Sequence, residues 1–403
     1  MWPMISLPES LVDATSGNPK IQRKDYLPTG SLAVIDQGQD IVAGYTNDMT
    51  ATYRGSLPVV LFGDHTRAIK YVDQPFALGA GGVKVLVPRG GFSAKFLYYY
   101  LLSRNIPSRG YSRHFKFLKE LSVPVVAPSE QHRIVELLDE ADRLRQLRRR
   151  ADAKAACILP ALFLHLFGDP ATNPKGWSVG TVGSALVASD YGSSTRASDD
   201  GAGLPLIRMG NVGYDGSLQL DDLKYVELPA AEVERLRLQH GDILFNRTNS
   251  RELVGKTGLW DADLDAVPAS YFIRLRVDRA QVEPVFLWAY MNSAYMKRTL
   301  EATARGAIGQ ANINTTELRA LPLYKPPLGL QRSFGGKVLA IRSVLPAATA
   351  RSDLDELFTL MLQRAFSGQL TAKWRELRMK ELLAEMEQQA RLLNLPAPTL
   401  ADA

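Results

Sequence analysis

Two stretches of this chain read alike: Leu32-Ala-Val-Ile35-Asp-Gln-Gly38 and Leu204-Pro-Leu-Ile207-Arg-Met-Gly210. In the same way, Phe96-Leu97-x-x-Tyr100-x-x-Ser103 reappears as Phe286-Leu287-x-x-Tyr290-x-x-Ser293. The repeating unit is far longer than the roughly 20–50 residues of a solenoid repeat, so each copy is long enough to form a domain of its own. The repetition predicts two similar mixed α/β domains that perform one operation at two places.

A third pair of segments follows in the same order. Leu118-x-x-Leu121-x-Val123 with Gln131 corresponds to Leu318-x-x-Leu321-x-Leu323 with Gln331. The separation between the copies grows along the chain, which indicates longer loops in the second copy. A chain of 403 residues, of which 46% are hydrophobic, can form two ordinary cores.

We expect five parts along the chain. Residues 1–127 form the first domain, 128–168 a first long helix and 169–325 the second domain. Residues 326–368 form a second long helix, and 369–403 a charged helical tail.

The two long helices carry apolar residues at alternating three- and four-residue spacing, which is typical of a coiled-coil seam. The first seam, in which only Arg148 breaks the apolar set, reads Ile134, Leu137, Ala141, Leu144, Arg148, Ala151, Ala155, Ile158 and Leu162. The second, which shifts phase after Pro346, reads Phe334, Val338, Ile341, Leu345, Ala348, Leu354, Phe358, Met361 and Ala365. The best-matched surface for each seam is the other, so we expect an α+β fold in which the helices form an antiparallel coiled coil with a pseudo-two-fold repeat. The alternative is that each helix packs separately on its own domain.

The single cysteine, Cys157, excludes an intramolecular disulfide and a multi-cysteine zinc site. Its place within a helix predicts a small buried side chain. No segment resembles a signal peptide, and no apolar run is long enough to cross a bilayer, so we expect a cytoplasmic protein. The net charge of +6 is compatible with a polyanionic partner.

The sequence does not match the motifs of catalysis and of cofactor binding. Gly255-Lys256-Thr257 resembles the end of a phosphate-binding loop, but Ser250 stands where that loop needs glycine. Gly79-Ala-Gly81-Gly82 lacks the third glycine of a dinucleotide fingerprint. An Asn-Pro-Pro-aromatic segment of an adenine methyltransferase is missing, and the five histidines have no metal-ligand spacing. We therefore expect no catalytic residue, cofactor or metal in this chain.

Polar loops follow β-type runs at roughly corresponding places in the two copies. Their guanidinium, amide and hydroxyl groups are suited to contact DNA base edges and phosphates, although the same residue types also stabilise turns. The candidate DNA-binding residues of the first copy are Ser16, Asn18, Lys20, Gln37, Gln39, His65, Thr66 and Arg67. Those of the second copy are Tyr191, Ser193, Ser194, Thr195, Arg208, Asn211, Asn246, Arg247, Thr248, Asn249, Ser250 and Lys256.

Four motifs, taken in their order, resemble the specificity subunits of type I restriction–modification systems. They are Pro128-x-x-Gln131-x-Arg133, Leu166-Phe-Gly-Asp-Pro170 with Asn173-Pro-Lys-Gly-Trp177, Gly241-Asp-Ile-Leu-Phe-Asn-Arg247 with Val254-Gly-Lys-Thr-Gly-Leu-Trp260, and Ala365-Phe-Ser-Gly-Gln-Leu370. The resemblance covers nearly the whole chain. The second helix departs from the pattern because Pro326-Pro-Leu-Gly-Leu-Gln331-Arg lacks the usual acidic residue.

This resemblance implies two target recognition domains, each reading one half of a split DNA site. Asp36 aligns with Arg208 and Gln39 with Asn211, so the half-sites are expected to differ and the target to be asymmetric. It also implies that the spacer helices dock two modification subunits, which carry S-adenosylmethionine and methylate adenine, and that restriction subunits join through them. The alternative function is a doubled adaptor or scaffold that binds protein or RNA partners.

Overall fold

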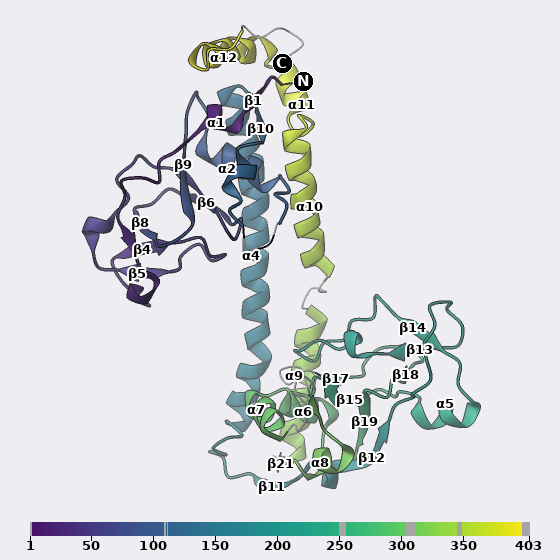
Figure 1. Cartoon of the computed structure of the whole chain (residues 1–403). Coiled ribbons are helices and arrows are strands. Elements are labelled where there is room, and N and C mark those ends of the chain that lie inside the picture. The colour runs from purple at the N-terminus through teal and green to yellow at the C-terminus, as the bar shows by residue number, and fades with distance from the viewer. Residues whose placement is uncertain are drawn as a thin grey trace. The chain divides into compact units, whose positions relative to one another are not determined.

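The computed structural model describes residues 2–108, 110, 112–249, 255–303, 311–344 and 349–396. The chain divides into two compact units: unit 1 comprises residues 1–149 and 348–403, and unit 2 comprises residues 150–347. Helix α4 (Pro128–Phe167) contributes residues to both (Figure 1). Within the described part of the chain, no helix is long and apolar enough to span a membrane.

Unit 1 contains two four-stranded sheets and a short two-stranded ladder. The first sheet is antiparallel, in the order β2 (Leu11–Asp13), β9 (Val83–Pro88), β6 (Val59–Gly63) and β7 (Ile69–Val72). The second is mixed, in the order β3 (Lys20–Ile21), β8 (Phe76–Gly79), β4 (Leu32–Ile35) and β5 (Gly44–Thr46). The ladder pairs β1 (Met4–Ser6) with β10 (Ser122–Pro124), and the helices are α1 (Leu7–Ser10), α2 (Ala94–Leu102), α3 (Phe115–Leu118), α10 (Thr349–Phe366), α11 (Ala372–Glu376) and α12 (Met379–Leu392).

Unit 2 repeats this arrangement with longer loops. Its antiparallel sheet has the order β12 (Leu186–Tyr191), β19 (Phe272–Val277), β15 (Ile243–Asn246) and β17 (Thr257–Leu259). Its mixed sheet has the order β14 (Lys224–Val226), β13 (Leu204–Ile207) and β18 (Val267–Pro268). Two ladders pair β11 (Ser178–Thr181) with β21 (Pro322–Lys325) and β16 (Thr248–Asn249) with β20 (Ala311–Asn312). The helices are α5 (Ala230–Leu236), α6 (Pro284–Met291), α7 (Ala294–Thr303), α8 (Thr315–Ala320) and α9 (Leu328–Val344).

The strand topology is therefore duplicated. In unit 1, β2 pairs with β9, and β9 pairs with β6 of the β6–β7 hairpin. In unit 2, β12 pairs with β19, and β19 pairs with β15 of the β15–β17 hairpin. The duplicated segments 32–35 and 204–207 form β4 and β13, and each pairs with one antiparallel and one parallel neighbour. The sequence repeat thus corresponds to the same strand in the same surroundings.

Buried glutamines explain why Gln131 and Gln331 recur. The Gln131 amide accepts a hydrogen bond from the backbone nitrogen of Ser93 (2.9 Å) and donates to the oxygen of Val126 (2.7 Å). In unit 2, the Gln331 side chain accepts from the backbone nitrogen of Glu283 (3.0 Å), and its Nε2 donates to the backbone oxygen of Pro326 (2.7 Å). Each amide therefore ties the start of a long helix to the residue before a domain helix, α2 or α6.

Buried aromatic residues explain the second repeat. The Tyr100 hydroxyl donates to the oxygen of Ser122, and the Tyr290 hydroxyl donates to the oxygen of Pro322 at 3.0 Å. Both tyrosine side chains are almost completely buried. These bonds hold α2 and α6 against the ladder strand that precedes each long helix.

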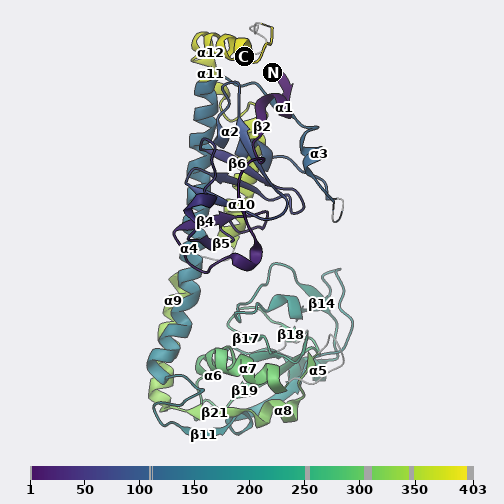
Figure 2. The ribbon, with the colours of Figure 1, turned by 60° about the vertical axis from the view of Figure 1, so that its left-hand side comes forward.

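The long helices pack against their own unit at each end. In unit 1, α10 lies beside the first part of α4 in both views (Figures 1 and 2), and the Arg145 guanidinium bonds to Asp355 at 2.7 Å and lies 4.1 Å from the Phe358 ring. In unit 2, the rings of Phe163 and Phe334 lie 5.9 Å apart. Both α4 and its partner helices also contact the domain cores.

The single apolar seam predicted along the first helix is wrong in its middle. Leu144, Ala151 and Ile158 are exposed, whereas Ile134 and Leu138 are buried in unit 1. Each end of α4 packs in the core of its own unit, whereas Leu144, Ala151 and Ile158 belong to neither core among the described residues. On the second helix the predicted Phe334, Val338, Phe358 and Ala365 are buried; Leu345 and Ala348 lie outside the described residues.

The predicted burial of the cysteine is also wrong. Cys157 is exposed, on the central stretch of α4 that neither core covers.

The tail α11–α12 packs against the start of α4 in unit 1. The buried Glu130 carboxylate accepts from the Thr371 hydroxyl (2.6 Å) and pairs with Arg375 (3.1 Å), and burial raises its pKa above the usual range. Glu385 accepts from the backbone nitrogen of Ser129 at 2.8 Å. The positions of Ser129 and Glu130 correspond to Gly329 and Leu330 in unit 2, so the polar contacts of the tail are specific to unit 1.

We expect Gln331→Leu to destabilise unit 2, because it keeps the volume of the side chain but leaves two backbone groups without partners. The cost is about 1–3 kcal/mol for each group left unsatisfied. Thermal unfolding would measure the loss, and hydrogen exchange would place it at α6 and α9. Lys337→Ala, an exposed change on the same helix, is the control; equal stability of the two variants would contradict the role given to Gln331.

Candidate functional site

The loops of unit 2 gather at one edge of its antiparallel sheet. Tyr191 ends β12 opposite Ile273, and Asn246 ends β15 opposite Phe272. The backbone nitrogen of Asn246 donates to the oxygen of Lys256 (2.8 Å), so the segment before β17 lies at the same edge. The edge site consists of Tyr191, Arg247, Thr248, Lys256 and Asn312.

Arg247 lies at the centre of the edge site. Its backbone nitrogen donates to the oxygen of Tyr271 and its oxygen accepts from Ile313, both at 2.9 Å, so its backbone is fixed on two sides. The guanidinium carbon lies 4.8 Å from the centre of the Tyr191 ring, a cation–π geometry. Among the described residues its Nε, which is buried, has no hydrogen-bond partner. The guanidinium is therefore oriented by an aromatic face.

Tyr191 is itself oriented by the first residue of helix α8. Its hydroxyl accepts from the backbone nitrogen of Thr315 at 3.2 Å. Hydrogen bonding with Thr315 and, less strongly, the charge of Arg247 hold the pKa of Tyr191 below its ordinary value. The Tyr191 residue is 40% exposed, so its ring is also accessible to a flat partner such as a base.

The ladder β16–β20 brings in residues that sequence reasoning missed. The Thr248 hydroxyl donates to the Asn312 side-chain oxygen at 3.2 Å, and Thr315 contacts Tyr191. A usable signal was present: Asn314-x-x-Glu317 forms a reciprocal capping box, which marks a helix start and therefore a polar loop before it.

Several predicted residues use their polar groups inside the domain. The Asn211 side chain, which is buried, accepts from the backbone nitrogen of Arg208 (2.9 Å) and donates to the oxygens of Gln219 (2.8 Å) and Asp222 (2.9 Å). Arg208 bonds to Asp222 through the carboxylate and the backbone oxygen, both at 2.9 Å. These contacts hold the loop after β13 and leave Asn211 no free amide group for a base.

Other predicted residues of unit 2 fall into three groups. Asn246 and Ser193 are buried, so the structure does not place them for direct contact. Ser194 and Thr195 are exposed on the loop after β12. Asn249 lies in β16, and Ser250 lies outside the described residues.

The first domain brings three predicted residues together. Gln37 accepts from the backbone nitrogen of His65 through its side chain (3.2 Å) and from the Thr66 hydroxyl through its backbone oxygen. Arg67 has a positive φ of 62° and donates to the oxygen of Ile106 at 2.8 Å, and Asn18 accepts from the backbone nitrogen of Arg54 at 3.1 Å. Arg67 and Asn18 thus hold their loops in place.

The remaining predicted residues of the first domain, Ser16, Lys20 and Gln39, are exposed. Within the ranges that the structure describes, no group of His, Cys, Asp and Glu residues is arranged to hold a metal ion. The side chains of the edge site are two cations, an amide, two hydroxyls and an aromatic ring, which are groups suited to binding a ligand.

No protein-family model matches this sequence. Over 169 residues the chain is 27% identical to the putative specificity subunit of the type I restriction enzyme MjaX of Methanocaldococcus jannaschii, covering 41% of this chain and 39% of that protein. Over 277 residues it is 26% identical to the specificity subunit of the type I restriction enzyme StySPI of Salmonella potsdam, covering 63% of this chain and 59% of that protein. The chain thus spans less than two thirds of the length of each of these relatives.

A solved structure shows the same fold. The type I restriction–modification S subunit from M. genitalium superimposes on 91% of this chain and 96% of its own, with a TM-score of 0.58 and 16% sequence identity. Together with the curated relatives, this likeness confirms the resemblance that the sequence motifs indicate.

We expect Asn211→Ala to lower the stability of unit 2 by about 1–3 kcal/mol, because at least one buried backbone group loses its partner. Hydrogen exchange should rise in residues 208–222, and denaturant unfolding should measure the loss. The aligned variant Gln39→Ala changes an exposed side chain and should alter stability by less than about 0.5 kcal/mol. Asn211→Ala with unchanged stability would show that its amide is free for another partner.

Proposed function

We propose that this chain, which is similar in sequence to specificity subunits of type I restriction enzymes and shares their fold, is the DNA-recognition subunit of such a complex. The observation that carries the proposal is the edge site. The same arrangement of strands occurs in both domains, but the polar loops that follow these strands differ. In this function the chain is not itself an enzyme, and the parts 1–127 and 169–325 are its two target recognition domains.

The DNA target in this proposal is split and asymmetric. The hairpin loop of the first domain presents His65 and Thr66 beside Gln37. The corresponding loop of the second domain presents Arg247 and Thr248 beside Tyr191 and Asn312. A guanidinium favours guanine and an amide favours adenine, so the two domains are suited to different half-sites.

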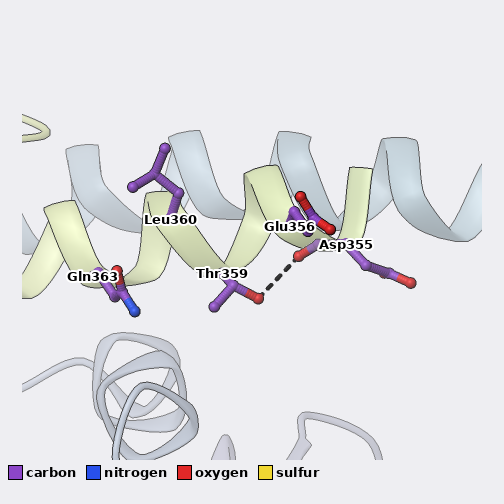
Figure 3. A pocket seen from close by; sticks show the side chains of 5 residues that line it. All are labelled: Asp355, Glu356, Thr359, Leu360 and Gln363. Carbon is purple, nitrogen blue, oxygen red and sulfur yellow. Dashed lines mark hydrogen bonds between the residues drawn. The ribbon is translucent and has the colours of Figure 1, made fainter. Parts of the chain in front are cut away.

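The long helices are proposed to pair as an antiparallel spacer and to dock two modification subunits. Leu144 and Leu147 of α4 and Leu357 and Leu360 of α10 are 42–49% exposed, which leaves an apolar surface on unit 1. A pocket on α10 is lined by five side chains, shown in Figure 3: Asp355, Glu356, Thr359, Leu360 and Gln363. In unit 2, Ile158 and Leu164 of α4 and Leu339 of α9 are similarly exposed.

The partners would supply the chemistry. The modification subunits would carry S-adenosylmethionine and transfer its methyl group to adenine N6, and restriction subunits would join through them. Such a complex works on DNA in the cytoplasm.

Methylome sequencing of the host with and without this gene tests the proposal. We expect a set of adenines within one asymmetric, split motif to lose methylation when the gene is deleted. A palindromic motif would contradict two different half-sites. No change in methylation, combined with capture of protein partners but not of duplex DNA by the purified chain, would favour the adaptor function.

We expect Arg247→Ala to weaken binding of the specific duplex by about 1–3 kcal/mol, the value of one bidentate base contact. Only the half-site read by the second domain should become degenerate in the methylome. Arg235→Ala, an exposed arginine on α5 of the same unit, is the control. If Arg247 instead holds a phosphate, all sequences should weaken alike and the salt dependence should decrease.

A further inference from the structure

Lys297 lies beside the segment of the edge site that carries Lys256. Lys297, on α7, donates to the backbone oxygen of Gly255 at 3.0 Å, so its ammonium lies next to the residue that precedes Lys256. Lys256 donates to the oxygen of Met209 at 3.0 Å. The Lys297 ammonium also lies 4.9 Å from the centre of the Tyr214 ring. Helix α7 and the segment 209–214 thus both contact the segment 255–256, and Lys297 and Lys256 each bring a positive charge.

The charges of this lysine pair are not neutralised within the described residues. Neither ammonium forms a salt bridge with a carboxylate there. Burial and then the charge of Lys256 lower the pKa of Lys297 to about 8, and the charge of Asp215 opposes this shift. The Asp215 carboxylate already accepts from the Ser217 hydroxyl at 2.7 Å and from its backbone nitrogen at 3.0 Å. Two partly desolvated cations that have no carboxylate partner in the described part of the chain favour the binding of an anion.

The pair belongs to the second domain alone. In the alignment of the repeats, Lys297 corresponds to Pro107, and the strand pairing of the hairpins places Ala68 where unit 2 has Lys256. The buried lysine of the first domain, Lys70, instead donates to the backbone oxygens of Asp36 and Asp40, and the nearby carboxylates oppose the effect of burial on its pKa. Lys70 therefore supports its own loop, next to Asp36 and Asp40.

We propose that Lys256 and Lys297 form a phosphate site that holds the backbone of the nucleic acid bound at the edge site, with Tyr214 beside it. This inference rests on the proposed function and deepens it, because it separates an anchoring contact from the sequence-reading contact of Arg247. An ammonium recognises a phosphate oxygen as a point charge and carries little information about base identity. Backbone carbonyls already hold both ammonium groups in place, so the anion would meet a preformed site.

The first arm of the test measures how duplex binding depends on salt. The full-length chain with Lys297→Met should lose about 0.9 from the slope of log affinity against log salt, the value for one phosphate contact. Its preference among half-site sequences should stay unchanged. Lys297→Arg should keep the slope because it keeps the charge, and Lys175→Met, at an exposed lysine of the same unit, should behave as the original chain.

The second arm does not depend on DNA. Reductive methylation with a carbon-13 label would follow the titration of Lys297 by NMR, with and without tripolyphosphate. A bound anion favours the charged ammonium, so the pKa of Lys297 should rise toward the ordinary lysine value when tripolyphosphate is added.

The outcomes separate the two proposals. If the chain binds duplex DNA but Lys297→Met keeps the original salt slope, or changes which half-site is preferred, the phosphate site is wrong and the proposed function stands. If the chain does not bind duplex DNA, the proposed function fails and the tripolyphosphate titration decides: an unchanged pKa of Lys297 overturns the site, and a raised pKa supports it as a polyphosphate site.

Discussion

Helix α4 has apolar residues to bury at both ends, and it buries them in two different hydrophobic cores. Ile134 and Leu138 enter the core of unit 1, and Phe163 and Phe167 enter that of unit 2. In each unit a buried glutamine amide ties the long helix to the start of a short domain helix, and a buried tyrosine hydroxyl ties that domain helix to the ladder strand. Leu144, Ala151 and Ile158, in the middle of α4, belong to neither core among the described residues and are exposed.

Much of the frame was predictable because identical surroundings select similar residues. The duplicated strand and the tyrosine–glutamine positions recur since each performs the same packing and hydrogen-bonding task in both units. The seam was predictable only in part: spacing identifies a helix face, but not whether a neighbour covers it, as Leu144 and Ile158 show.

The candidate site was harder to predict for two physical reasons. A polar residue type in a loop does not reveal whether its hydrogen bonds are already formed inside the protein, which is the case for Asn211. Contacts such as Thr248 with Asn312, and Lys297 with Gly255, depend on pairing between distant segments. The loops around Arg247 were identified from residue chemistry, whereas their neighbours required the three-dimensional arrangement.

The tail and α10 come from the end of the chain, yet they complete the unit formed by its beginning. During synthesis, unit 2 is a continuous segment and can close as it leaves the ribosome, while unit 1 waits for residues 348–403. At roughly 5–20 residues per second the delay is on the order of ten seconds or more. Throughout that interval Phe96 lacks its neighbour Phe366, and Tyr99 lacks its neighbour Phe358. Residues 1–149 are therefore synthesised before unit 2, but unit 1 completes its folding after it.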